Sequence, residues 1–130
     1  MTLACPCGRT QAQGKPQAFV ACCGRCLDQG TPAPDAESLM RSRYSAFALG
    51  RVEYLLTSWH ASTRPADLTL EPGVKWLGLD VKHHRLIDDT HAEVEFVARS
   101  RVGGRGQRLH EISRFVREGG RWFYVDGDLK

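Results

Sequence analysis

The sequence predicts an α+β fold in which helices come first and a curved antiparallel sheet follows, with a small cysteine-rich segment in front of both. Three observations predict it. All five cysteines fall in the first 26 residues, apolar residues then recur at helical spacing, and the apolar period changes to two towards the C-terminus. The chain has 130 residues, 42% of them hydrophobic and 25% charged, which is ordinary globular composition.

The cysteine-rich segment, residues 1–30, carries few large apolar side chains. So little apolar surface cannot form a core, and such a segment usually needs a metal ion to hold it. A connector with two prolines follows, and Asp35 at its end is a good N-cap. We therefore expect two units, a metal module over residues 1–30 and an α+β unit over residues 31–130.

Two amphipathic helices should open the second unit. Met40, Tyr44 and Phe47 follow at helical spacing, and Gly50 ends that series. A second series runs over residues 52–59 with the spacing i, i+3, i+4, i+7. Alternation of apolar and polar residues over 77–87 then predicts a long strand.

Three further strands can be paired from their turns. Gly119 and Gly120 fit a two-residue hairpin turn, which pairs Phe115 with Tyr124 and Ser113 with Asp126. Residues 103–106 are interpreted as a four-residue loop in the hairpin before it. That loop would place Glu95 opposite Arg114 and Phe96 opposite Ser113.

These pairings gather most aromatic residues on one face of the sheet, which should lie under the helices. Polar residues fall among them and suggest a pocket shared with helical residues. The pocket candidates are Arg43, His60, Glu111, Ser113, Trp122, Tyr124 and Asp126. The competing interpretation is a buried ion pair between a helical arginine and Glu111 or Asp126. The opposite sheet face carries a thinner apolar stripe, which leaves room for a dimer.

The charge distribution argues against several function classes. The net charge is +3, and all of the excess lies in residues 1–27. Direct binding of nucleic acid is not expected, because the chain lacks a dense basic stripe with interleaved aromatics. No apolar run is long enough for a membrane span, and only four residues precede Cys5, too few for a secretory signal. We therefore expect a cytoplasmic protein.

The cysteine cluster is the strongest chemical signal. In a reducing cytosol a tight cluster binds metal more often than it forms disulfides, and an odd count argues against a complete disulfide framework. Four thiolates suit zinc, and a closed site of that kind is structural rather than catalytic. Spacing alone leaves two ligand sets open: Cys5, Cys7, Cys22 and Cys23, or Cys5, Cys7, Cys23 and Cys26. Arg9, Lys15 and Arg25 supply positive charge nearby.

The cysteine pattern resembles a known motif. Cys5-Pro6-Cys7-Gly8 with Cys22-Cys23-Gly24 is similar to the SEC-C motif, a small zinc module. Nearly the whole chain resembles the YchJ-like family of uncharacterised bacterial proteins. The resemblance lies in residues 30–34 and 39–48, Tyr54-Leu55, Trp59-His60, and residues 76–79, 96–99, 113–115 and 122–127.

The resemblance implies a SEC-C module followed by a nuclear transport factor 2-like (NTF2-like), cystatin-like α+β roll. It also implies that Zn²⁺ is held by Cys5, Cys7, Cys22 and Cys23, which leaves Cys26 spare. Fourteen residues, 8–21, separate the two cysteine pairs, a longer loop than is usual in the motif. The set that contains Cys26 therefore stays an alternative.

The family brings no established activity, so two functions are compared. The first is a zinc-binding protein whose module docks on a protein or ribosomal partner, with the roll as scaffold or second docking surface. The second is a small-molecule binder or enzyme that uses the cavity of the roll. We favour the first, and we assign no catalytic residue.

Overall fold

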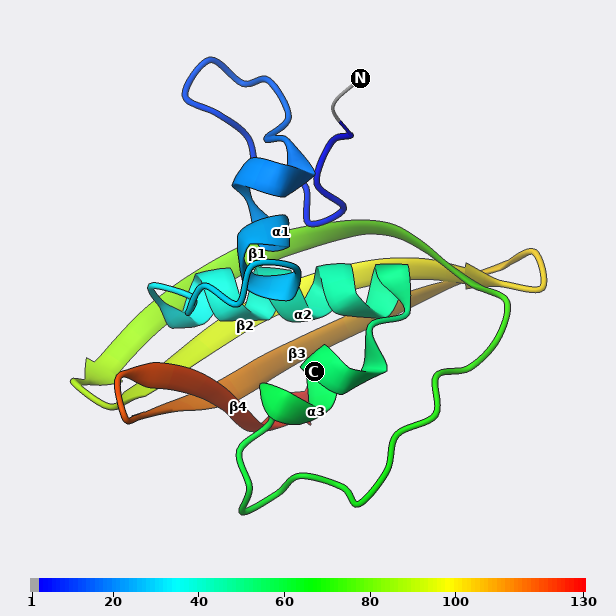
Figure 1. Cartoon of the computed structure of the whole chain (residues 1–130). Helices are drawn as coiled ribbons and strands as arrows, with labels where there is room; N and C mark the ends of the chain where they lie inside the picture. The colour runs from blue at the N-terminus through cyan, green and yellow to red at the C-terminus, as the bar shows by residue number, and fades with distance from the viewer. Residues whose placement is uncertain (1–2) are drawn as a thin grey trace.

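The computed structural model describes residues 3–130. Its largest element is a four-stranded antiparallel sheet (Figure 1). Its strands follow one another in space as they do in sequence. They are β1 (Val74–Asp88), β2 (His91–Val102), β3 (Arg105–Glu118) and β4 (Arg121–Leu129). Short turns join them, so the sheet is a meander of three hairpins.

Two helices lie between the cysteine-rich segment and the sheet in the sequence, and the longer one lies across one face of the sheet (Figure 1). This helix, α2 (Ala36–Leu49), begins where the side chain of Asp35 accepts a hydrogen bond from the Ser38 backbone N–H at 2.7 Å. It ends at Gly50, whose φ of 74° is in the left-handed region. The shorter α3 (Val52–Thr57) follows directly. The predicted α+β architecture is confirmed.

The cysteine-rich segment forms a small structure of its own. Two isolated antiparallel bridges, Ala4 to Ala18 and Thr10 to Pro16, connect its first residues to residues 16–18. A one-turn 3₁₀ helix, η1 (Phe19–Ala21), and the short α1 (Cys23–Leu27) complete it. The residues between the two cysteine pairs double back on themselves, so the long loop still brings Cys22 towards Cys7.

The predicted pairing of β2 with β3 is wrong by two residues. Gly103 and Gly104, with φ of 56° and 78°, form a two-residue turn in place of the expected four-residue loop. Glu95 therefore faces Ile112 rather than Arg114, and Phe96 faces Glu111 rather than Ser113. Because side chains alternate with a period of two, a shift of two residues leaves every side chain on its predicted face.

A β-bulge corrects the prediction for Asp126. The pairing of β3 with β4 slips between Arg114 and Phe115, so Asp126 faces Arg114 rather than Ser113. Phe115 still faces Tyr124, as predicted. The bulge adds one residue to β4 between Tyr124 and Asp126. The side chain of Asp126 therefore lies on the face of the sheet opposite to that of Tyr124. There it accepts a hydrogen bond from Arg114 Nε at 2.6 Å.

One continuous core joins both parts of the chain. Residues of α2, β2 and β3 supply most of it, and three cysteines of the N-terminal segment belong to the same cluster. Its members include Cys5, Cys7, Cys23, Leu39, Met40, Tyr44, Val94, Phe96 and Phe115. The cysteine segment therefore packs on the roll through α2. Within the described residues no helix is long and apolar enough to cross a membrane.

Candidate functional site

Four cysteine sulfurs meet beside α2. Cys5 and Cys7 sit on a tight turn closed by a hydrogen bond from the Gly8 N–H to the Cys5 carbonyl oxygen at 3.2 Å. Gly8 has a φ of 77°, a conformation that glycine adopts without strain. Cys22 and Cys23 stand at the start of α1. The four Sγ atoms all lie within 4.8 Å of one another.

The spacing of these sulfurs suits a tetrahedral metal ion. Zn–S bonds of roughly 2.3 Å in a tetrahedron place sulfurs roughly 3.8 Å apart. The Sγ atoms of Cys7 and Cys22 are 3.7 Å apart. Cys5, Cys7 and Cys23 are buried and Cys22 is half-buried, so protein surrounds the cluster on most sides. Thiolate sulfur is a ligand that zinc accepts readily, and the donor set fits that ion.

The thiols disturb one another's ionisation. Side-chain hydrogen bonds from Cys23 and Cys7 lower the pKa of Cys5 far below its ordinary value. Hydrogen bonding to Cys5 and Cys7 raises the pKa of Cys23. Burial, together with repulsion from the neighbouring Cys7 and Cys5 side chains, raises the pKa of Cys22 to about 12. Four thiolates gathered in one place would repel one another, and a bound cation would remove that repulsion.

Cys26 lies outside this cluster. It is half-buried on α1, and burial raises the pKa of its thiol. Among residues 3–130, the side chains that lie close enough together to share one metal ion include Cys22 but not Cys26. The fold thus gathers the first of the two ligand sets, because the start of α1 points Cys22 and Cys23 towards the turn that carries Cys5 and Cys7.

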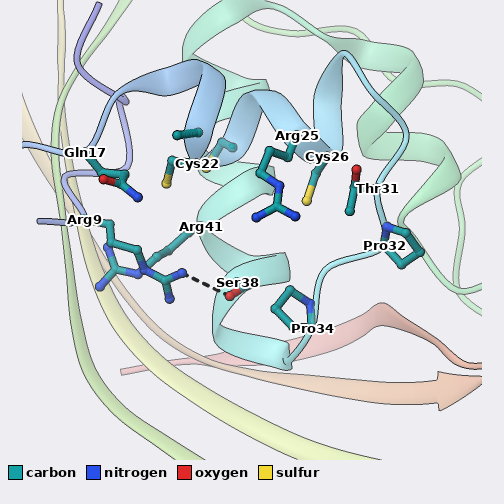
Figure 2. Close-up of a pocket in the computed structure, with 12 residues that line it drawn as sticks. Arg9, Gln17, Cys22, Arg25, Cys26, Thr31, Pro32, Pro34, Ser38 and Arg41 are labelled. Atoms are coloured by element: carbon teal, nitrogen blue, oxygen red, sulfur yellow. Dashed lines mark hydrogen bonds between the residues drawn. The ribbon is translucent and has the colours of Figure 1, made fainter. Parts of the chain in front are cut away.

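A groove lined by arginines opens next to the cluster (Figure 2). It has a volume of about 290 Å³ and runs between the cysteine segment and the first turns of α2. Arg9, Arg25 and Arg41 line it, together with Cys22 and Cys26. Figure 2 shows the guanidinium groups of Arg9 and Arg25 turned into this space.

Two of the three basic residues expected near the cysteines lie beside the cluster. Arg9 and Arg25 line the groove. Lys15 is exposed on the loop between the cysteine pairs and is not part of the lining. The third arginine in the lining is Arg41 of α2. Its Nη1 donates a hydrogen bond to the Cys7 carbonyl oxygen at 3.0 Å. Sequence reasoning missed this contact, because 34 residues separate the two partners.

Glu37 of α2 connects the cysteine segment to this helix through hydrogen bonds. It accepts hydrogen bonds from Arg41 at 2.9 Å and from Arg9 at 3.2 Å, and Arg9 also donates to Ser38 at 3.2 Å. Burial by itself would raise the pKa of Glu37, but the two arginines outweigh it and hold that pKa below its ordinary value. The N-terminal segment is therefore fastened to α2 by charged hydrogen bonds as well as by apolar packing.

A second cavity, of about 250 Å³, lies between α2 and the sheet. Four of the seven predicted pocket residues line it: Arg43, Glu111, Ser113 and Tyr124. Most of the remaining lining is apolar, and sequence reasoning did not assign it to a pocket. It consists of Met40, Tyr44, Phe47, Trp59, Trp76, Phe96, Ala98, Leu109 and Phe115.

The other three predicted residues lie elsewhere. His60 Nε2 is 2.8 Å from a carboxylate oxygen of Glu118, outside the cavity, since the loop after α3 follows the edge strand β4. Trp122 is buried against the core and lines a separate hollow with Leu39. Asp126 lies on the opposite face of the sheet because of the bulge. The structure therefore does not bring these three residues to the cavity.

Arg43 is buried in the cavity wall. Its Nη1 donates to the Leu55 carbonyl oxygen at 2.8 Å and to Ser58 Oγ at 2.7 Å. Its guanidinium carbon lies 5.1 Å from the ring centre of Trp59 and 4.6 Å from that of Tyr124. Burial lowers the pKa of Arg43 to about 10, against the influence of Tyr124, Tyr54 and Glu111.

The expected ion pair between a helical arginine and Glu111 or Asp126 does not form among the described residues. Glu111 accepts a short hydrogen bond from Ser113 Oγ, and Asp126 pairs with Arg114 of the neighbouring strand. Gly127 leaves room for Glu111, because a Cβ at this position would clash with a Glu111 carboxylate oxygen. The cavity wall thus holds a buried cation and a carboxylate that are not joined in an ion pair.

Taken together, an NTF2-like roll with an N-terminal four-cysteine cluster defines the class of protein. Comparison with solved structures supports that class. A SEC-C motif containing protein from Rhodopseudomonas palustris superposes with a TM-score of 0.81 at 31% identity, over 97% of this chain and 98% of its own. A sec-c motif containing protein from Psychrobacter arcticus gives 0.78 at 28% identity, over 98% and 82%.

Sequence comparison identifies the family. Residues 35–127 match the family model described as "YchJ, middle NTF2-like domain". A UPF0225 protein of Polaromonas naphthalenivorans is 64% identical, over 98% of both chains. Another from Bordetella parapertussis is 58% identical, over 98% of this chain and 93% of its own. The chain belongs to the YchJ-like, UPF0225 family.

Proposed function

We propose that Cys5, Cys7, Cys22 and Cys23 bind one Zn²⁺ ion per chain. The observation that carries this proposal is the meeting of their four sulfurs within 4.8 Å, at a spacing that suits tetrahedral zinc. The similarity to two proteins described as containing the SEC-C motif supports it. With four thiolate ligands no position stays open for substrate, so the ion has a structural role.

Metal analysis of single Cys→Ser variants tests the ligand set. Wild-type protein purified without chelator should contain one zinc per chain, and Cys22→Ser should lose most of it. Cys26→Ser is the matched control, since it changes a neighbouring cysteine outside the cluster and should keep the metal. Loss of zinc from Cys26→Ser with retention by Cys22→Ser would assign the alternative set.

We further propose that the zinc-bound segment docks on a protein or ribosomal partner in the cytoplasm. The arginine groove supports this, because it lies between the segment and α2 and therefore keeps its shape only while the segment is folded. Arg25 is exposed there, and no salt bridge among the described residues involves it. An exposed cation at the edge of a groove is suited to an acidic or polar partner surface.

Partner capture with zinc-loaded protein tests the docking role. Cys22→Ser and Arg25→Glu should each lose the captured partner. Lys15→Glu reverses a charge on the same segment but outside the groove, so it should keep the partner. A partner retained by Cys22→Ser would transfer the docking role to the roll.

A further inference from the structure

The cavity between α2 and the sheet has the composition of a small-molecule site. Aromatic rings from both layers form most of its wall: Tyr44, Phe47, Trp59, Trp76, Phe96, Phe115 and Tyr124. Polar side chains are few, and they are placed among these rings. Ligand pockets in proteins commonly combine an apolar, aromatic wall with a small number of polar groups that fix orientation.

Three polar groups of the wall have hydrogen-bonding capacity to spare. The indole Nε1 of Trp59 is buried and has no hydrogen-bond partner among the described residues. Both side-chain hydrogen bonds that Arg43 makes within residues 3–130 use Nη1, which leaves Nη2 and Nε for another acceptor. Glu111 accepts from Ser113 through Oε2 and lies beside the hydroxyl of Tyr124, and because a carboxylate has about four acceptor sites it can take a further donor. Buried polar groups are normally satisfied, so these donors favour a ligand that supplies an acceptor, which the covered Nε1 of Trp59 can meet when the indole shifts towards it.

The signs of these groups restrict the charge of the ligand. An anionic ligand would meet the carboxylate of Glu111, and a cationic ligand would meet the guanidinium of Arg43. Among the described residues neither group forms an ion pair, so an ion of either sign would be attracted by one group, repelled by the other, and stripped of its hydration in a largely apolar cavity. A neutral ligand avoids both penalties. An adjacent acceptor and donor on that ligand would satisfy Trp59 or Arg43 on one side and Glu111 on the other.

The size and shape of the cavity restrict the ligand further. Cavities of roughly 150 Å³ lined by apolar side chains hold benzene, so the volume of about 250 Å³ suits a molecule of about two rings. The wall is largely aromatic, and an aromatic ligand can pack on such rings edge to face or offset, as Trp59 packs on Tyr124 with ring centres 5.2 Å apart. We propose that this cavity binds a neutral, planar, bicyclic compound with a carbonyl acceptor beside an N–H donor, the chemistry of a lactam.

Binding of quinolin-2-one to the full zinc-loaded chain tests the proposal. Trp59 and Trp76 line the cavity, so tryptophan fluorescence should change saturably with the probe. Naphthalene has the same shape without the polar edge, and 2-naphthoate adds a negative charge. We expect quinolin-2-one to bind at least tenfold more tightly than either. Equal or tighter binding of naphthalene or 2-naphthoate would overturn the assignment of the ligand class.

Variants locate the bound probe. Leu109 lines the cavity and is 37% exposed, so Leu109→Trp should block the space without disturbing the core, and binding should be lost. Leu86→Trp is the matched control, because Leu86 is 61% exposed on β1 and away from the cavity. Trp59→Phe keeps a ring and removes the N–H, so it should weaken quinolin-2-one about tenfold and leave naphthalene unchanged. No saturable binding, or binding that survives Leu109→Trp, would overturn the proposal.

Discussion

Arg41 Nη1 donates a hydrogen bond to the backbone carbonyl oxygen of Cys7 at 3.0 Å, and the same guanidinium pairs through Nε with Glu37 at 2.9 Å. A residue in the middle of α2 therefore touches the turn that presents two of the proposed zinc ligands. Hydrogen bonds to the backbone around a metal ligand orient that ligand, so α2 takes part in shaping the candidate metal centre.

Removal of the metal should affect the two parts of the chain differently. Chelation, or Cys22→Ser, should disorder residues 3–30, because the segment has few large apolar side chains of its own and its contacts with α2 depend on the cysteine turn that the ion would hold. The roll should still unfold in one cooperative transition, at a lower temperature, since Cys5, Cys7 and Cys23 pack in the shared core. Circular dichroism melts with and without chelator measure this, with Cys26→Ser as control. Complete loss of the cooperative transition would show that the roll needs the metal to fold.

Glu37→Gln should weaken the attachment of the cysteine segment to α2. The two arginines hold the pKa of Glu37 below its ordinary value, so its contribution is present above that value and lost as the pH falls through the folded pKa. Because Glu37 is partly exposed, we expect a loss of about 1 kcal/mol near neutral pH. Urea unfolding at pH 7 and at pH 3 should show wild type and variant converging in acid.

Glu53→Gln provides the comparison for this experiment. Glu53 lies in the first turn of α3, is exposed and forms no salt bridge within the described part of the chain. The free energy of unfolding of Glu53→Gln should match that of the wild-type protein at pH 7 and at pH 3. A difference between wild type and Glu37→Gln that stays constant down to pH 3 would contradict the proposed ionic attachment.

Gly24→Ala should damage the cysteine segment. A Cβ at this position would lie 2.7 Å from the backbone oxygen of Phe19, so η1 and the start of α1 would have to separate. Overpacking of this kind costs about 1–3 kcal/mol, and it should lower zinc affinity because Cys22 and Cys23 stand at the same junction. Competition with a zinc chelator measures the change. Gly106→Ala, where a Cβ meets nothing within 4 Å, should leave zinc affinity as in wild type.

Arg43→Leu should destabilise the roll. It removes the donor to the Leu55 carbonyl oxygen and to Ser58, which fastens the end of α3 to α2, and it removes the contact with two aromatic rings. We expect a loss of about 1–3 kcal/mol in urea unfolding. Arg43→Lys should not restore stability, since an ammonium group cannot reproduce the planar stacking and the fork of donors. Full rescue by lysine would mean that positive charge alone matters at this position.

Local patterns in the sequence determined a large part of this structure. Helical spacing and the stops at Asp35 and Gly50 placed α2, and the Gly119-Gly120 turn fixed the register at the start of the last hairpin. The face assignment of Glu111 and Ser113 followed from the period of two. These features depend on backbone geometry over a few residues, and such geometry is encoded in short stretches of sequence.

Tertiary structure alone decided the rest. Three glycines within residues 103–106 permit either turn length, and only the pairing of complete strands selected the shorter one. The bulge that turned Asp126 away leaves no mark in the alternation of β4, because it arises from packing against β3. Arg41 reaches Cys7 across 34 residues, and the cavity forms where α2 stands over the sheet. Contacts of this kind depend on how whole elements pack, and no local pattern specifies that.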